Sequence, residues 1–331
     1  MLDLGGDLLL PGFVDVHIHA FKGMDTMQGE EAVRHMSREL KKVGVAAFLP
    51  TTMSASPEDT VKALAGVKAV MERPEPDGAI VLGAHMEAPF LAEAKAGAQL
   101  KQYFADPNEE NWQRYTGGLE SVVRLITMAP ERAGALAFIS ALTKKGITVS
   151  IGHTTADAET THAAAEAGAT HVTHTFNAQT PLNHRAPGVP GAALVDDRLQ
   201  CEVISDGIHL HPDIVKLIIR TKGKEKLVAI TDAMEAAGMP DGQYQLGGQE
   251  VFVHEGAARL KDGTLAGSTL TMIRAFQNLI RFGATPEEAA LMTTKTPALS
   301  IGNEELGEIE LGAPAIFSRF DENYAFKGTV G

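Results

Sequence analysis

The stretch at residues 14–20 reads VDVHIHA, and it decides how the rest of the chain is interpreted. The alternating apolar residues at its start are typical of a short strand. His17 and His19 stand at its end and are separated by one strand period, so both imidazoles point to the same side and can share a metal ion. Taken alone, an HxH pair is as compatible with two incidental surface histidines as with a metal site.

Seven further apolar runs follow this one, with segments of helical composition between them. The eight candidate strands are Val14–Ile18, Val45–Leu49, Ile80–His85, Val122–Met128, Ile147–Ile151, Thr170–Thr173, Cys201–Ile204 and Leu227–Thr231. The helical segments include Glu30–Val43, Pro57–Met71, Arg132–Lys145, Ala156–Ala167 and Pro212–Thr221. This alternation predicts an α/β protein with a closed (β/α)₈ TIM-like barrel. A doubly wound open sheet is the alternative, but no GxGxxG follows the first strand.

The pattern changes after Asp232. Gln243–Val253 and Ala257–Leu260 alternate with glycines and predict short hairpin strands, Leu270–Phe282 and Pro286–Lys295 return to helix, and the C-terminal segment again predicts strands. The expected division is a catalytic barrel over residues 11–300, including a β-hairpin segment at about 243–262, and a remnant of a small β-sandwich over residues 1–10 and 301–331.

Length and composition exclude several classes of protein. The 331 residues are enough for two domains or one large barrel. Lysine and arginine total 29 against 42 acidic residues, so the net charge of −13 opposes a general affinity for nucleic-acid phosphates. Cys201 is the single cysteine, which excludes intramolecular disulfides and zinc clusters that need several thiolates. Any metal site must therefore use His, Asp and Glu.

The N-terminal apolar run is short and follows no basic segment, and no stretch approaches the roughly 18 apolar residues of a membrane span. We therefore expect a cytoplasmic protein with neither a membrane nor a nucleic acid as its partner.

Polar residues also follow the other candidate strands. The full set of strand-end candidates is His17, His19, Glu87, His153, His174, Asp206, His209 and Asp232. Each one alone is more often structural, but in a (β/α)₈ barrel the carboxyl ends of all strands open on one face, where active sites lie. Several histidines with carboxylates suit Zn²⁺ or Fe²⁺ with an open water position. This set predicts metal-assisted hydrolysis, in which the ion lowers the pKa of water to about 7 and Asp232 accepts its proton and passes it to a leaving amine.

Six further histidines lack a strand-end context or duplicate one that is filled, and we expect them to be structural. They are His35, His162, His171, His184, His211 and His254.

Seven blocks of sequence carry a resemblance to a known family. In chain order they are LPGFVDVHIHAFKGMDTM, GAHMEAPFLAEAKAGAQ, IGHTTAD, THTFNAQTPLNHRAPG, ISDGIHLHP, ITDAMEAAGMPDGQYQLGG and DGTLAGSTLTM. Together they resemble the N-acetylglucosamine-6-phosphate deacetylases of the amidohydrolase superfamily. HTFNAQTPLNHRAPG and TDAMEAAGMPDG are specific to this family within the superfamily.

The resemblance implies a distorted (β/α)₈ barrel with a small β-sandwich built from both chain ends. The implied reaction is hydrolysis of the acetamide of N-acetylglucosamine 6-phosphate to glucosamine 6-phosphate and acetate, in an enzyme that is commonly a homodimer. The implied metal ligands are Glu87, His153 and His174, with His17 and His19 supporting a second ion in some members, and Asp232 is the implied catalytic base. The implied substrate contacts are Gln99, Asn177, Ala178, Arg185 and His209, and Arg185 falls on the arginine that reaches across the dimer interface.

Three departures from the family pattern bear on function. Gln99 stands where the family usually has a histidine that contacts the substrate near its scissile carbonyl, and an amide cannot become an imidazolium. Ala88 replaces the glycine that usually follows the metal glutamate. Family members usually carry more residues before LPGFVD, so we expect an incomplete side domain here.

Two alternatives to this function remain open. One keeps the chemistry but changes the substrate to another N-acetyl hexosamine or an N-acyl amino acid, and Gln99 is its support. The other is a non-catalytic paralogue, which would be expected to lose its ligands or its base. Whether one ion or two are bound, whether the metal is zinc or iron, and which hexosamine epimer is preferred are also left open by the sequence.

Overall fold

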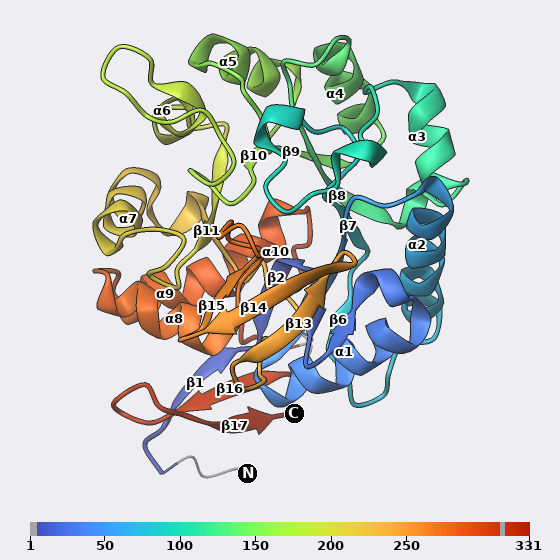
Figure 1. Cartoon of the computed structure of the whole chain (residues 1–331). Coiled ribbons are helices and arrows are strands. Elements are labelled where there is room, and N and C mark those ends of the chain that lie inside the picture. The colour runs from blue at the N-terminus through green and yellow to red at the C-terminus, as the bar shows by residue number, and fades with distance from the viewer. Residues whose placement is uncertain (1–4, 312–314) are drawn as a thin grey trace.

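The computed structural model describes residues 5–311 and 315–331. Its centre is a sheet of eight parallel strands in chain order (Figure 1). They are β2 (Phe13–Ile18), β5 (Val45–Thr52), β7 (Ala84–Met86), β8 (Val123–Met128), β9 (Thr148–Ile151), β10 (His171–Val172), β11 (Gln200–Ile204) and β12 (Leu227–Ile230), with β6 (Ile80–Val81) paired beside β5. All eight predicted strands are present, although the expected third strand is divided into β6 and β7.

Hydrogen bonds between β2 and the end of β12 close this sheet into a barrel. The backbone N–H of Asp232 donates to the carbonyl of His17 at 2.8 Å, and the N–H of His19 donates to the carbonyl of Ala233 at 3.0 Å. Asp15 on β2 accepts a hydrogen bond from the Thr231 hydroxyl at 2.5 Å. The predicted (β/α)₈ barrel is therefore confirmed, and the alternative prediction of an open doubly wound sheet is wrong.

Helices surround the barrel and cover its outer face (Figure 1). They are α1 (Glu30–Lys42), α2 (Pro57–Glu72), α3 (Glu109–Thr116), α4 (Ala135–Lys144), α5 (Ala158–Ala167), α6 (Gly188–Val195), α7 (Pro212–Lys226), α8 (Met272–Arg281), α9 (Pro286–Thr293) and α10 (Lys295–Ser300), with short 3₁₀ turns η1 (Thr26–Gln28), η2 (Glu93–Lys95), η3 (Lys101–Tyr103) and η4 (Glu120–Val122). Helices α3 and α6, and α10 after Lys295, lie outside the segments that were predicted to be helical. In α6, the glycines and the proline of GVPGAALV lower the intrinsic helix propensity, so tertiary packing decides its conformation.

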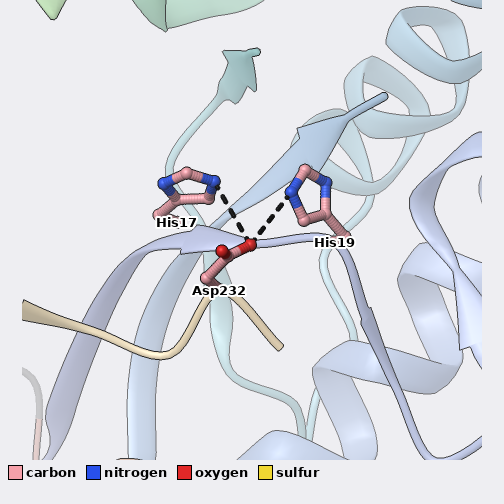
Figure 2. Close-up of side chains that lie close together, drawn as sticks. All are labelled: His17, His19 and Asp232. Carbon is pink, nitrogen blue, oxygen red and sulfur yellow. Dashed lines mark ion pairs between the residues drawn. The ribbon is translucent and has the colours of Figure 1, made fainter. Parts of the chain in front are cut away.

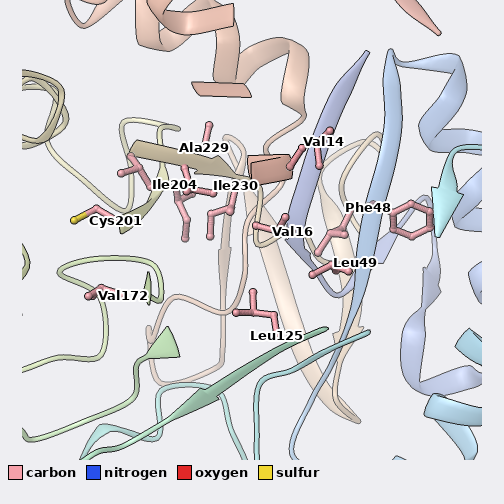
Figure 3. Close-up of a cluster of buried hydrophobic side chains, with 14 of the residues drawn as sticks. Val14, Val16, Phe48, Leu49, Leu125, Val172, Cys201, Ile204, Ala229 and Ile230 are labelled. Atoms are coloured by element: carbon pink, nitrogen blue, oxygen red, sulfur yellow. The ribbon is translucent and has the colours of Figure 1, made fainter. Parts of the chain in front are cut away.

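Apolar side chains from the strands form a buried hydrophobic core together with those of the surrounding helices (Figure 3). Val16, Leu125 and Ile230 are fully buried there, on three strands that lie far apart in sequence. Cys201 on β11 is buried in the same core, and burial raises the pKa of its thiol to about 11. The single cysteine therefore packs as a small apolar side chain.

Two small antiparallel sheets accompany the barrel. One joins β1 (Leu8–Pro11), β16 (Phe317–Phe320) and β17 (Phe326–Val330), so it contains both ends of the described chain. Phe320 anchors it to the barrel, with its ring 6.1 Å from that of Phe13 and 5.1 Å from that of Phe276.

The second sheet contains β13 (Gly242–Leu246), β14 (Gln249–His254) and β15 (Ala257–Arg259) and crosses in front of the barrel in Figure 1. Its apolar face packs on Met53 and Met234 in a separate buried cluster. A short ribbon of β3 (Ala20–Phe21) and β4 (Met24–Asp25) follows the first barrel strand. Within the described ranges, no helix combines the length and the apolar character that a membrane span requires.

Candidate active site

Three side chains from different strand ends meet at the mouth of the barrel. Glu87 follows β7, His153 follows β9 and His174 follows β10. Glu87 Oε1 lies 3.2 Å from His153 Nε2 and 3.0 Å from His174 Nε2. The two Nε2 atoms are 3.1 Å apart. These separations are close to those between ligand atoms around one small cation, because bonds of about 2.0–2.1 Å place tetrahedral neighbours roughly 3.3–3.4 Å apart.

A second group lies beside the first and contains His17, His19 and Asp232 (Figure 2). Asp232 Oδ1 lies 3.2 Å from His19 Nε2 and 3.6 Å from His17 Nε2. Glu87 joins the two groups, since its Oε1 is 3.3 Å from His17 Nε2 and its Oε2 is 3.1 Å from His19 Nε2. All six strand-end residues that the sequence analysis assigned to the metal and the base are therefore in one buried cluster.

The Nδ1 atoms of three histidines lie within hydrogen-bond distance of oxygen atoms. His17 Nδ1 lies 3.0 Å from Glu202 Oε2, His19 Nδ1 lies 3.2 Å from the Thr51 carbonyl, and His153 Nδ1 lies 2.7 Å from the Lys95 carbonyl. Donation from Nδ1 to these oxygens fixes the tautomer in which Nε2 is free to bind a metal.

The backbone turns sharply where three of these side chains leave their strands. His153, His174 and Asp232 each lie two residues beyond a strand, with φ values of 45°, 29° and 50°. Such left-handed conformations cost about 1–3 kcal/mol each for residues with side chains, and they concentrate at functional sites. The turns direct all three side chains into the shared cluster.

Buried carboxylates dominate the electrostatics of the cluster. Burial lowers the pKa of His19, but hydrogen bonds and charge attraction from Asp232 and Glu87 outweigh burial and raise it to about 9. The same balance holds the pKa of His17 well above its ordinary value. Burial raises the pKa values of Glu87 and Asp232, but the surrounding imidazoles outweigh burial and lower both. The carboxylates therefore stay ionised and require positive charge beside them.

A divalent cation fits these residues. The donor set is nitrogen and carboxylate oxygen, as in many zinc and iron sites, and each group offers three ligand atoms within 4.8 Å of one another. His17 Nε2 is buried and makes no well-aligned hydrogen bond although two carboxylates lie near it. A cation between the groups would satisfy this nitrogen and balance the carboxylate charge.

A cavity of about 300 Å³ opens above the cluster. Gln99, Asn177, Ala178 and His209, all predicted to contact substrate, line it together with the cluster residues. Arg185 is exposed and is not among the described residues that line the cavity. Four of the five predicted substrate residues therefore line the cavity, and Arg185 lies outside it.

Two of these residues are positioned by neighbours. His209 Nδ1 lies 2.7 Å from Asp206 Oδ2, which leaves Nε2 free. Gln99 Nε2 donates to Glu87 Oε2 at 2.7 Å, while Gln99 Oε1 accepts from the backbone N–H of Ser54 at 2.7 Å. Gln99 therefore contacts a candidate metal ligand directly.

Sequence reasoning missed three residues around the cluster. Glu202 is fully buried on β11 and holds His17, and His85 is fully buried on β7 with its Nε2 2.8 Å from the Thr127 hydroxyl. Lys95 supplies the carbonyl for His153 and also lines the cavity. A charged residue inside the buried strand QCEVI was the available signal for Glu202, because such residues are rarely buried without a partner.

A (β/α)₈ barrel with histidines and carboxylates converging at the carboxyl ends of its strands defines the class of barrel hydrolases that bind divalent metals. The family model described as the amidohydrolase family matches residues 8–328. The chain belongs to this family.

Individual relatives are similar over nearly the whole chain. An N-acetylglucosamine-6-phosphate deacetylase from Lysinibacillus sphaericus is 38% identical over 336 residues, covering 99% of this chain and 85% of the relative. An N-acetylgalactosamine-6-phosphate deacetylase from Escherichia coli O157:H7 is 37% identical, covering 93% of this chain and 82% of the relative. The structure of a mutant N-acetyl-D-glucosamine-6-phosphate deacetylase from Mycobacterium smegmatis, in complex with N-acetyl-D-glucosamine-6-phosphate, superposes with a TM-score of 0.91 at 33% identity, covering 98% of this chain and 85% of that one.

Proposed function

We propose that this protein is a hydrolase that removes the acetyl group of N-acetylglucosamine 6-phosphate, giving glucosamine 6-phosphate and acetate. The convergence of Glu87, His153, His174 and Asp232 at one cavity carries the proposal. Membership of the amidohydrolase family and the deacetylase relatives support it. The intact ligand and base set also argues against a non-catalytic paralogue.

Glu87, His153 and His174 would hold the tighter ion, zinc or iron, and His17 and His19 a weaker second one. A divalent cation there supplies Lewis-acid polarisation of the amide carbonyl and a water that is more acidic than bulk water. The carbonyl of Lys95 and the carboxylate of Glu202 keep His153 and His17 in the required tautomer. Gln99 holds Glu87 from the other side of its carboxylate.

Asp232 is the general base and then the general acid. The imidazoles around it lower its pKa, so it is ionised and can accept a proton on a carboxylate oxygen from the attacking water. It then gives that proton to the amine nitrogen as the C–N bond breaks, because an unprotonated amine is a very poor leaving group. The left-handed backbone at residue 232 fixes the side chain toward the cavity for both transfers.

The sugar phosphate would lie toward Asn177, Ala178 and His209. His209 is held through Nδ1, so its Nε2 is free to bind a sugar or phosphate oxygen. Arg185 is exposed, which suits a guanidinium that reaches the phosphate in the partner subunit of a homodimer. We place this enzyme in the cytoplasm, where phosphorylated sugars are produced and consumed.

An acetate-release assay tests the proposal. Purified protein is given N-acetylglucosamine 6-phosphate, its galactosamine epimer and unphosphorylated N-acetylglucosamine. We expect the phosphorylated glucosamine derivative to have the highest kcat/KM. Equal turnover of the unphosphorylated sugar would favour a different N-acyl substrate, and preference for the epimer would reassign the hexosamine.

A further inference from the structure

Two cavities meet at Met53, the residue that follows β5. The first contains the candidate active site, and the second, of about 350 Å³, lies on the other side of Met53. Among the residues that the structure describes, Met53 alone lines both cavities. Its side chain is buried, with 3% of its surface exposed. Met53 is therefore the wall between the active site and a second space.

One side chain, Gln99, separates Met53 from the cluster of candidate metal ligands. Gln99 Nε2 lies 3.5 Å from Met53 Sδ and 2.7 Å from Glu87 Oε2. On its other side, Met53 packs against the turn between β13 and β14, where a Cβ placed at Gly247 would lie 3.3 Å from Met53 Cβ and Cε. Gln249 Nε2 fixes this turn by donating to the Ala98 carbonyl at 2.6 Å.

The position of Met53 determines which part of a substrate it meets. In the proposed reaction, the acyl carbon lies at Glu87 and the sugar extends toward His209, so the acetyl methyl group needs an apolar wall elsewhere in the cavity. Met53 and Leu246 provide one, because both line the cavity and share a buried apolar cluster next to Gln99.

We propose that Met53 sets the length of the N-acyl group that this enzyme removes, by closing the acetyl end of the active site against the second cavity. The proposal rests on the proposed deacetylase function. A methionine side chain is flexible and unbranched, so truncating it opens a path without changing the backbone.

The lining of the second cavity identifies the acyl groups that it takes. Its apolar side chains are Met27, Ala55, Leu100 and Tyr103. Its carboxylates are Asp25, Asp59 and Glu235. Propionyl and butyryl groups would extend along the apolar residues, whereas a succinyl group would bring negative charge toward the carboxylates and is excluded.

The test compares N-acetyl, N-propionyl, N-butyryl and N-succinyl glucosamine 6-phosphate as substrates of the wild type and of Met53→Ala. One methylene in an apolar pocket changes kcat/KM by about 10- to 200-fold. We expect the butyryl-to-acetyl ratio of kcat/KM to rise at least about tenfold in Met53→Ala, with succinyl remaining poor. Met53→Val, which shortens the side chain less, should shift the ratio in the same direction by a smaller factor and covers the case in which the alanine variant does not fold.

Two control variants locate the effect in the second cavity. Leu100→Ala enlarges that cavity but leaves Met53 in place, so the acyl ratio should stay within about twofold of the wild type. Adding Ala55→Phe to Met53→Ala fills the cavity and should cancel the gain. An unchanged ratio in Met53→Ala, or an equal rise in Leu100→Ala, overturns the proposal. Failure of the wild type to hydrolyse even the acetyl substrate would instead contradict the proposed function.

Discussion

Replacing Gln99 with leucine removes two hydrogen bonds that its side-chain amide makes. The substitution keeps the approximate size of the side chain but removes the donor to Glu87 Oε2 and the acceptor for the Ser54 N–H, both 2.7 Å away. Partners that orient metal ligands typically contribute 10- to 100-fold to metal affinity. We therefore expect Gln99→Leu to bind its metal about 10- to 100-fold more weakly. The unpaired Ser54 N–H should also lower the free energy of unfolding by about 1–3 kcal/mol.

Chelator competition measures the metal affinity, and denaturant titration of the metal-free protein measures the stability. Gln249→Leu is the matched control, because it removes one hydrogen bond to Ala98, next to Gln99, without contacting Glu87. Its metal affinity should stay within about twofold of the wild type. The reasoning is refuted if Gln99→Leu retains wild-type metal affinity, or if the control loses as much.

The remaining predictions concern the proton, the phosphate and acid stability. Asp232→Asn keeps the shape but removes the proton acceptor, so kcat should fall at least about a hundredfold while the ion at Glu87, His153 and His174 is retained; a loss below tenfold would place the base elsewhere. Arg185→Ala should lower kcat/KM roughly ten- to a hundredfold on the phosphorylated sugar and hardly at all on the unphosphorylated one; an equal loss on both would remove Arg185 from phosphate binding. Burial lowers the pKa of His171 from 6.5 to about 4, so the folded protein keeps it neutral while the unfolded chain protonates it as the pH falls below about 6.5. This group should cost about 2 kcal/mol of stability between pH 7 and pH 5, measured by urea unfolding, and a His171→Gln variant with the same pH dependence as the wild type would contradict it.

The barrel was predictable from the sequence because its strands are local features. Each is a short buried apolar run, and a parallel barrel brings the following polar residues to one face whatever their separation in the chain. Glu87, His153 and His174 therefore converge as expected. The helix at residues 188–195 was not predictable, because its sequence is poor in helix formers and only packing stabilises it.

The hydrogen bonds that position the candidate metal ligands depend on geometry that no local sequence pattern predicts. Glu202 holds His17 from a strand 185 residues away, so the pairing follows from the way the barrel closes. Gln99 was predicted to contact substrate, and the structure adds a hydrogen bond to Glu87 that a motif does not reveal. The position of Met53 in the sequence, directly after a strand, does not indicate a role, because its contacts with the hairpin sheet appear only in the folded structure.

Acetate release from N-acetylglucosamine 6-phosphate before and after metal removal tests the central claim most directly. The protein is treated with a chelator, dialysed and analysed for metal, and its activity is measured again after addition of Zn²⁺ or Fe²⁺. We predict that hydrolysis disappears with the metal and returns when one of these ions is restored. Undiminished hydrolysis by protein that contains no metal would contradict the account.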